Sequence, residues 1–339
     1  MIANNIDDIK TAIEKLIELR EKQYKKHVTR PSVIWKKWLQ MLGFIREFSN
    51  DRLSDIRLHT GFGFFLGSNW STCYYEKNEI ELGIKEVENS QYIKDYHKLT
   101  KELSKEFFCS EIDVNRELIS ISYNDKYINE DVLRFQSTIS NLSCLKNKNI
   151  KRYLEIGAGY GGLCNQFNKL FKPEQVIVID HPEVLFWSIV YTYINNKDAK
   201  IQIVTDLSED IIEDADFVFI SAFLTDIMKG YNVDLLVNEN SFCEMTEEQI
   251  NYYFDTVSFD LMYSNNRNRQ FMNSEVNSLN NIILNKYIVK PEPSYYKKYY
   301  SDDLNLHNLK YHFFASDDSN NLPNFKYENL SGLTIRTKH

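Results

Sequence analysis

Residues 151–163 read Lys-Arg-Tyr-Leu-Glu-Ile-Gly-Ala-Gly-Tyr-Gly-Gly-Leu, and this stretch decides the fold. A short apolar run ends at Ile156, a glycine-rich turn follows, and a helical pattern begins near Leu163. A strand, a glycine turn and a helix in this order bring the backbone close to a bound nucleotide. Glycine permits the tight turn and carries no Cβ that would block the ligand. The first amides of the helix are expected to bind polar ligand atoms.

The glycine spacing fits two kinds of nucleotide. Gly157, Gly159 and Gly162 match the dinucleotide fingerprint, whereas Gly157, Gly159 and Gly161 match the methyltransferase pattern. A carboxylate at Glu155 aimed at the turn would repel a pyrophosphate but suit the sulfonium and ammonium groups of S-adenosylmethionine. The alternative, that Glu155 points away and pairs with a lysine, fits less well because the strand is otherwise apolar. We therefore expect S-adenosylmethionine to contact Glu155, Gly157, Ala158, Gly159, Tyr160 and Gly161.

The next apolar run, residues 175–180, ends in an acid that suits a nucleotide of either kind. Asp180 lies about 20 residues past the glycine turn, where an acidic residue bonds ribose hydroxyls. A second role, as cap of a helix that begins at Pro182, is compatible with the first. His181 is expected either to stack on the adenine or to cap the same helix.

Composition limits the function classes. The chain has 339 residues, of which 43% are hydrophobic, enough for one large domain or two of ordinary size. A net charge of −8 argues against a nucleic-acid partner, which needs clustered Lys and Arg. No apolar run approaches the roughly 20 residues of a membrane span. The five scattered cysteines are typical of reduced thiols. We expect a cytoplasmic protein with no membrane span and no required metal.

From residue 151 onward, strand and helix patterns alternate, which is typical of a parallel sheet with helices on both faces. The expected strands are 152–156, 175–180, 201–205, 216–221, 233–238 and 258–263. The expected helices are 162–170, 182–195, 246–257 and roughly 274–284. Two late strands, near 309–315 and 332–337, are expected to form an antiparallel pair at the edge of the sheet.

The residues before 146 show a different pattern. Residues 1–49 and 80–108 look helical, with a break at Pro31. Residues 54–78 are rich in glycine and aromatic side chains. A short strand is expected around 119–121, and a helix is expected to start from a cap near Asn129. We predict a mainly helical domain over 1–145, for acceptor binding, as a lid or for oligomerisation, and a nucleotide-binding domain over 146–339.

Polar side chains gather after two later strands. Strand 233–238 runs into the segment 238–246, and strand 258–263 runs into 264–269. Ligands of a doubly wound sheet bind beyond the carboxyl ends of its strands. We therefore expect Asn238, Asn240 and Ser241 to contact the cofactor and Asn265 and Arg267 to contact the substrate, with turn formation as the alternative role for Asn and Ser. His59, in the glycine and aromatic segment, is a further substrate-binding candidate.

Four strings in this order carry a family resemblance. They are E-I-G-A-G-Y-G-G at 155–162, I-D-H-P at 179–182, N-S-F-x-E-M at 240–245 and Y-S-N-N at 263–266. The chain resembles the bacterial sugar O-methyltransferases, most closely over 150–270. The resemblance implies a Rossmann-like, doubly wound class I methyltransferase sheet, with S-adenosylmethionine as methyl donor. It also implies a sugar, nucleotide-sugar or glycan acceptor and a place in surface-polysaccharide biosynthesis. His181 departs from the apolar residue expected before the proline.

Methyl transfer to a hydroxyl benefits from a base, and two carboxylates are candidates. Glu244 is the first and Glu239 the rival; a helix-start position for Glu244 and a salt bridge for Glu239 are the alternatives. Two other functions stay open: a nicotinamide-dependent oxidoreductase, and a protein that binds S-adenosylmethionine without catalysis. A homodimer is one assembly that we consider.

Overall fold

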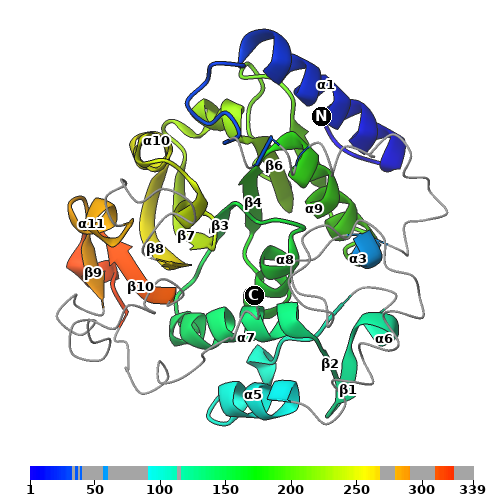
Figure 1. Cartoon of the computed structure of the whole chain (residues 1–339), viewed down its shortest axis with the longest axis vertical. Coiled ribbons are helices and arrows are strands. Elements are labelled where there is room, and N and C mark those ends of the chain that lie inside the picture. The colour runs from blue at the N-terminus through cyan, green and yellow to red at the C-terminus, as the bar shows by residue number, and fades with distance from the viewer. Residues whose placement is uncertain are drawn as a thin grey trace.

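The computed structural model describes residues 1–32, 35–36, 39, 56–59, 91–112, 116–267, 279–290 and 310–323. Its centre is an eight-stranded sheet in the order β5–β6–β4–β3–β7–β8–β10–β9 (Figure 1). The first six of these strands run parallel, and β10 is antiparallel to both β8 and β9. The strands are β3 (Arg152–Ile156), β4 (Gln175–Asp180), β5 (Ile201–Val204), β6 (Phe217–Ser221), β7 (Asn232–Glu239), β8 (Ser258–Arg267), β9 (Ile288–Lys290) and β10 (Lys310–Ser316).

Helices surround the sheet, some packed on it and others on neighbouring helices. They are α1 (Ile6–Gln23), α3 (Ile56–His59), α5 (Gln91–Thr100), α6 (Arg116–Ile119), α7 (Glu130–Leu142), α8 (Gly162–Phe171), α9 (Pro182–Asn195), α10 (Glu247–Thr256) and α11 (Leu279–Leu284). Helices α8 and α9 contact each other and β4, whereas α10 packs with α11 and with the 3₁₀ segment η5 (Ala222–Met228). Right-handed crossovers to either side of β3 place these two groups on opposite faces. The predicted doubly wound, Rossmann-like α/β fold is confirmed.

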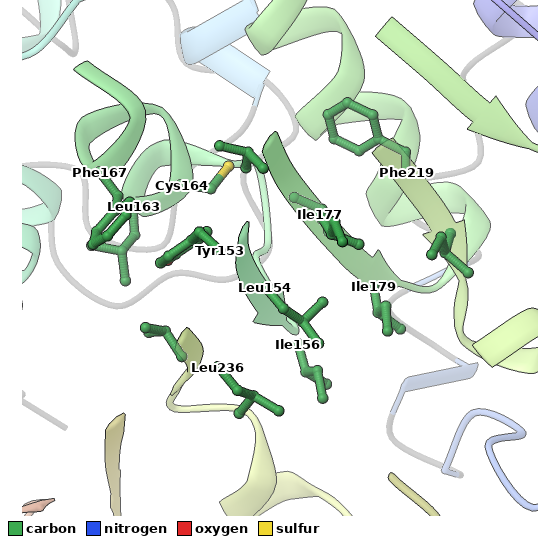
Figure 2. Packing of buried hydrophobic residues seen from close by; sticks show 14 of the residues in the cluster. Tyr153, Leu154, Ile156, Leu163, Cys164, Phe167, Ile177, Ile179, Phe219 and Leu236 are labelled. Atoms are coloured by element: carbon green, nitrogen blue, oxygen red, sulfur yellow. The ribbon is translucent and has the colours of Figure 1, made fainter. Parts of the chain in front are cut away.

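The central strands are buried on both faces, which explains their continuous apolar runs. Figure 2 shows Leu154 of β3 and Ile177 of β4 in the buried cluster, and these two residues are register partners on adjacent parallel strands. Tyr153 leaves β3 toward α8, where its ring stacks on that of Phe167 with 4.1 Å between centroids. The apolar face of α8 is thereby held against β3, directly after the glycine turn.

Elements before residue 146 share one core with the sheet. Helix α1 packs along α9, α7 packs along α8, and their buried apolar side chains join those of the strands in one cluster (Figure 1). The backbone of Met1 and Ala3 also pairs with the edge strand β5, through a bond of 2.9 Å from Ala3 N to Ile201 O and one of 2.8 Å from Ile203 N to Met1 O. The division at residue 145 stays a prediction.

Local patterns placed many element ends correctly. The predicted cap is confirmed, since the Asn129 side chain accepts a hydrogen bond of 2.8 Å from Val132 N at the start of α7. The strand expected around 119–121 is instead a hairpin, β1 (Ile121–Tyr123) and β2 (Lys126–Ile128), with left-handed Asn124 and Asp125 at its turn.

Two expectations need correction, and two others lie outside the described residues. Helix α1 ends at Gln23, before the proline expected to break it. The late strand β10 pairs with β8 and with β9, a strand of three residues that the sequence pattern did not reveal. The expected strand at 332–337 and most of segment 54–78 lie outside the described residues. None of the described helices combines the length and the apolar character needed to cross a membrane.

Candidate functional site

The carboxyl ends of β3 and β7 mark the candidate site. The chain leaves β3 for β4 on one side and later returns past it to β7 on the other side. Ligands of doubly wound sheets bind in the crevice outside such a reversal point. The glycine turn after β3 and the segment 238–244 after β7 meet there, as the contact between Gly157 and Ser241 shows.

The glycine turn depends on its missing Cβ atoms in an unexpected way. Gly157, Gly159 and Gly161 have positive φ of 76°, 60° and 87°. A Cβ on Gly157 would overlap the Ser241 side chain, and one on Gly162 would lie 2.5 Å from the ring of Phe135. We expected these gaps to make room for the ligand. At Gly157 and Gly162 the space left by the missing Cβ is filled by protein side chains instead. These glycines therefore allow the turn to pack closely against segment 238–244 and against α7.

Glu155 is buried below the turn. Its carboxylate accepts hydrogen bonds from the Tyr153 hydroxyl, at 2.9 Å, and from the backbone amide of Cys164 in the first turn of α8. No lysine is among its partners in the described chain. Burial, together with the nearby carboxylates of Glu239 and Asp180, raises the pKa of Glu155 to about 8 in spite of those bonds. The Cys164 amide, expected to be free for a ligand, is therefore already occupied.

Asp180 ties the end of β4 to the glycine turn. Its carboxylate accepts hydrogen bonds from Gly159 N at 3.1 Å and from His181 N at 2.7 Å. Burial raises its pKa to about 7, and the carboxylates of Glu244 and Glu183 add to the rise. The cap position of α9 belongs to His181, whose side chain makes no capping bond. The cap role considered for Asp180 is therefore wrong.

Two residues from the N-terminal region join this side of the site. Arg20 of α1 binds Glu183 through two hydrogen bonds of 2.8 Å, and burial followed by the charge of Arg20 lowers the pKa of His181 to about 3. The indole N–H of Trp35 donates to Glu244 Oε2 at 3.2 Å, and its ring lies 6.2 Å from that of His181. Neither residue is a predicted site residue.

A signal for Arg20 was present in the sequence. Ile9, Ile13, Leu16 and Arg20 follow at helical spacing, so a charged residue occupies the buried face of α1. A charge on an apolar face needs a partner elsewhere in the fold. Trp35 carries no comparable signal, because an aromatic residue at helical spacing is as typical of the hydrophobic core as of a binding site.

The segment after β7 is held by its own polar groups. Asn238 is fully buried; its amide donates to Ile156 O at 2.7 Å, and its oxygen accepts from Phe242 N and from Asn266 Nδ2, each at 2.9 Å. Asn240 has a positive φ of 56°, and its backbone N–H donates a hydrogen bond to the backbone carbonyl of Asn265. The turn-forming alternative thus describes the contacts present, and cofactor binding by Asn238, Asn240 and Ser241 stays a prediction.

Glu239 lies on the other side of the site, against α7. The Thr138 hydroxyl donates to Glu239 Oε2 at 2.9 Å, and Asn265 Nδ2 donates to Thr138 Oγ1 at 3.2 Å. Asn265 is the register partner of Glu239 in the sheet. Thr138 lies 101 residues before Glu239 in the sequence, yet α7 supplies polar groups to the carboxyl ends of β7 and β8.

Tyr160, predicted to contact the cofactor, points into an ionic network. Arg57 of α3 is fully buried, with its guanidinium 4.0 Å from the centroid of the Tyr160 ring. Arg57 also pairs with Glu111 at 2.9 Å and with Asp131 at 3.0 Å. Burial alone would raise the pKa of Glu111, but the charge and hydrogen bonds of Arg57 hold it below its ordinary value. Through the contact between Arg57 and Tyr160, the network stabilises the glycine turn from outside the sheet.

Several buried polar atoms between α7 and the turn lack a hydrogen-bond partner in the described chain. They are Asp131 Oδ1, Arg134 Nε, the Tyr160 hydroxyl and Asn265 Oδ1. Each such atom costs about 1–3 kcal/mol, and a native structure tolerates it where a ligand, an ion or water completes the site. The two remaining substrate candidates are not placed, since the side chains of His59 and Arg267 lie outside the described part. Within that part, no three His, Cys, Asp or Glu side chains are arranged to hold a metal ion.

Comparison with known proteins adds little beyond this geometry. No family model and no curated protein matches the chain. Similar solved structures include the methyltransferase domain of bacterial CtHen1, with 12% identity over 54% of this chain and 97% of that one and a TM-score of 0.35. Precorrin-6y C5,15-methyltransferase from Geobacter metallireducens is 13% identical over 61% and 98%, with a TM-score of 0.35.

A third solved structure is a Haemonchus contortus phosphoethanolamine N-methyltransferase with phosphomonomethylethanolamine and S-adenosylhomocysteine. It is 13% identical over 47% of this chain and 40% of that one, with a TM-score of 0.30. TM-scores of this size assign no function. What the site does must therefore be argued from the residues of this chain.

Proposed function

We propose that this protein is an S-adenosylmethionine-dependent methyltransferase. The observation that carries the proposal is the surplus of carboxylates around the glycine turn. Glu155, Asp180 and Glu239 lie at the carboxyl ends of three neighbouring strands, and the pKa of Glu155 is raised to about 8 and that of Asp180 to about 7. A ligand that brings positive charge would favour the ionised forms of these groups. S-adenosylmethionine carries a sulfonium and an ammonium group and no phosphate.

The contacts of Glu155 weigh against the nicotinamide alternative. A dinucleotide places its pyrophosphate on the first amides of the helix after the glycine turn. Here the Cys164 amide of that first turn is bound by a carboxylate. A diphosphate would also raise the pKa of Glu155 and Asp180 further, so its binding would be opposed by the same charges.

The finer proposal is methyl transfer to a hydroxyl of a sugar or glycoconjugate, as the family resemblance implies. When bound, S-adenosylmethionine supplies a methyl group activated by the sulfonium. The acceptor oxygen gains this methyl group as its bond to sulfur breaks, and the hydroxyl proton passes to a carboxylate of the chain. Alignment is worth up to about 7–11 kcal/mol in such a displacement, and a positioned base adds about 10²–10⁴-fold.

The surroundings of the two candidate bases assign them different tasks. Glu244 neighbours Asp180 and is bonded by Trp35, which lies beside His181. If Asp180 binds the ribose, Glu244 belongs to the nucleoside end of the site. Glu239 lies between the Thr138 hydroxyl and Glu155, nearer the polar face of α7. We therefore propose Glu239 as the base and Glu244 as a residue of the cofactor site.

Cofactor binding tests the proposal. Asp180→Ala should weaken S-adenosylmethionine binding by about tenfold or more, because the variant loses a charged hydrogen-bond acceptor for the ribose and the bond that holds Gly159. Isothermal titration calorimetry measures the change. Asp198→Ala, in the exposed turn before β5, is the matched control and should bind normally. Wild-type protein that binds NAD but neither S-adenosylmethionine nor S-adenosylhomocysteine would refute the proposal.

Comparison of Glu239→Gln with Glu244→Gln shows which of the two carboxylates is the base. Glu239→Gln should keep its affinity for S-adenosylmethionine within about twofold and lose about 10²-fold or more of the methyl transfer to a neutral glycoside. Glu244→Gln should weaken cofactor binding first. Calorimetry and the release of S-adenosylhomocysteine measure the two effects. The opposite pattern would return the base role to Glu244.

A further inference from the structure

Polar side chains of α7 gather where they meet the glycine turn and β8. Asp131, Arg134 and Thr138 follow at helical spacing on one face of α7, and Tyr160 and Asn265 complete the group; we refer to these five residues as the α7 polar cluster. Asp131, Arg134 and Thr138 were not among the site candidates of the sequence. The other face of α7 is apolar and packs in the core.

Four atoms of the α7 polar cluster are buried without a hydrogen-bond partner in the described chain: Asp131 Oδ1, Arg134 Nε, the Tyr160 hydroxyl and Asn265 Oδ1. Arg134 approaches Asp131 Oδ1 only to 3.6 Å, which is a charge contact and not a hydrogen bond. Natural proteins leave few such atoms, and four of them in one place indicate a missing occupant.

We propose that the α7 polar cluster is the acceptor site of the methyltransferase and that it takes an uncharged molecule with several hydroxyl groups. The proposal rests on the function proposed above. A hydroxyl both donates and accepts, so one polyol can meet Arg134 Nε and the oxygens of Asp131 and Asn265. An ammonium group only donates and leaves Arg134 without a partner. A phosphate only accepts and leaves Asp131 and Asn265 without one.

The charges around the α7 polar cluster also disfavour an anionic ligand. Arg57 and Arg134 face three carboxylates, those of Glu111, Asp131 and Glu239, and Arg57 is already paired with the first two. The remaining cation, Arg134, lies between Asp131 and Glu239. A phosphate-bearing acceptor would therefore meet repulsion where an uncharged glycoside would not.

The position of the cluster suits transfer from the proposed cofactor site. Thr138 bonds both Glu239, the proposed base, and Asn265. Tyr160 belongs to the glycine turn itself. An occupant bound by these residues would lie beside Glu239 and next to the cofactor turn, as the displacement requires.

The test uses full-length protein loaded with S-adenosylhomocysteine. Saturation-transfer NMR compares three uncharged probes, the methyl glycosides of glucose, mannose and rhamnose, with glucose 1-phosphate and glucosamine. We expect the uncharged probes to bind about tenfold or more tightly than the charged ones. Arg134→Gln and Tyr160→Phe should each weaken glycoside binding by about fivefold or more. Ser137→Ala, on α7 beside Thr138, should change nothing.

Tyr160→Phe removes only an unpartnered hydroxyl, so this variant should fold normally even if Arg134→Gln does not. A purely structural role for Tyr160 would leave glycoside binding unchanged. The proposal is overturned if no glycoside binds the loaded protein, if a charged probe binds better, if both variants bind like wild type, or if a crystal of the loaded protein with glycoside shows only water at the four atoms. Failure of S-adenosylhomocysteine to bind the wild type would instead count against the proposed function.

Discussion

Gly157→Ala should lower the free energy of unfolding by about 2–5 kcal/mol and abolish measurable cofactor binding. The left-handed backbone at Gly157, with φ of 76°, contributes about 1–2 kcal/mol of strain once a Cβ is present. The new methyl group would also overlap Ser241, and overpacking of this kind costs about 1–3 kcal/mol. Because the Cβ of Ser241 is itself involved, a change of rotamer cannot relieve the overlap. Segment 238–244 must move, and the proposed cofactor site moves with it.

Two variants separate strain from overlap. Gly230→Ala has the same kind of backbone, with φ of 81°, but no neighbour within 4 Å, so it should show only the strain and bind cofactor normally. Ser241→Gly, added to Gly157→Ala, removes the overlapping atoms and should recover part of the lost stability. Urea unfolding and calorimetric titration measure both effects. If Gly157→Ala behaved like Gly230→Ala, the contact between the two segments would not matter.

Glu155→Gln should remove about half of the loss of stability that the raised carboxyl pKa values cause between about pH 5 and 8. The pKa of Glu155 is about 8 in the folded protein, above its ordinary value of 4.5, so the folded state binds this proton more tightly than the unfolded state. The stabilising contribution is complete below pH 4.5 and is lost as the pH rises to about 8. At about 1.4 kcal/mol per pKa unit, the loss is at most roughly 4–5 kcal/mol in the ligand-free protein.

Urea unfolding at several pH values tests this expectation. Wild-type protein should lose stability as the pH rises from 5 to 8, whereas Glu155→Gln should keep only the slope that Asp180 contributes in the same direction, which is of similar size and ends near pH 7. Glu174→Gln, an exposed acid paired with Lys151, is the control and should keep the wild-type slope. Bound S-adenosylmethionine should reduce the wild-type slope, because its charge favours the ionised carboxylates. If the free energy of unfolding changed with pH equally in wild type and Glu155→Gln, the raised pKa would belong to another group.

Elements with strong local signals were predictable. The glycine turn, the Asn129 cap and the apolar strands depend on residues that are close in sequence, so most of their ends agree with the structure within a residue or two. The exception is β8, predicted to end at 263, which continues to Arg267. The short strand β9 could not be predicted, because three residues are too few to show the alternation of apolar and polar side chains that indicates a strand. The site contacts of Arg20 and Thr138 could not be predicted for another reason. Each acts through a partner far along the chain, Glu183 in the first case and Glu239 in the second.

The sequence by itself determined the doubly wound fold, the glycine turn and the carboxylates at the carboxyl ends of β3, β4 and β7. Only the tertiary structure decided which side chains meet these carboxylates. Packing of α7 brought Thr138 to Glu239, and burial of Glu155 raised its pKa. The physical reason is that strand and turn propensities act over a few residues, whereas desolvation and charge coupling depend on every element that packs around a group.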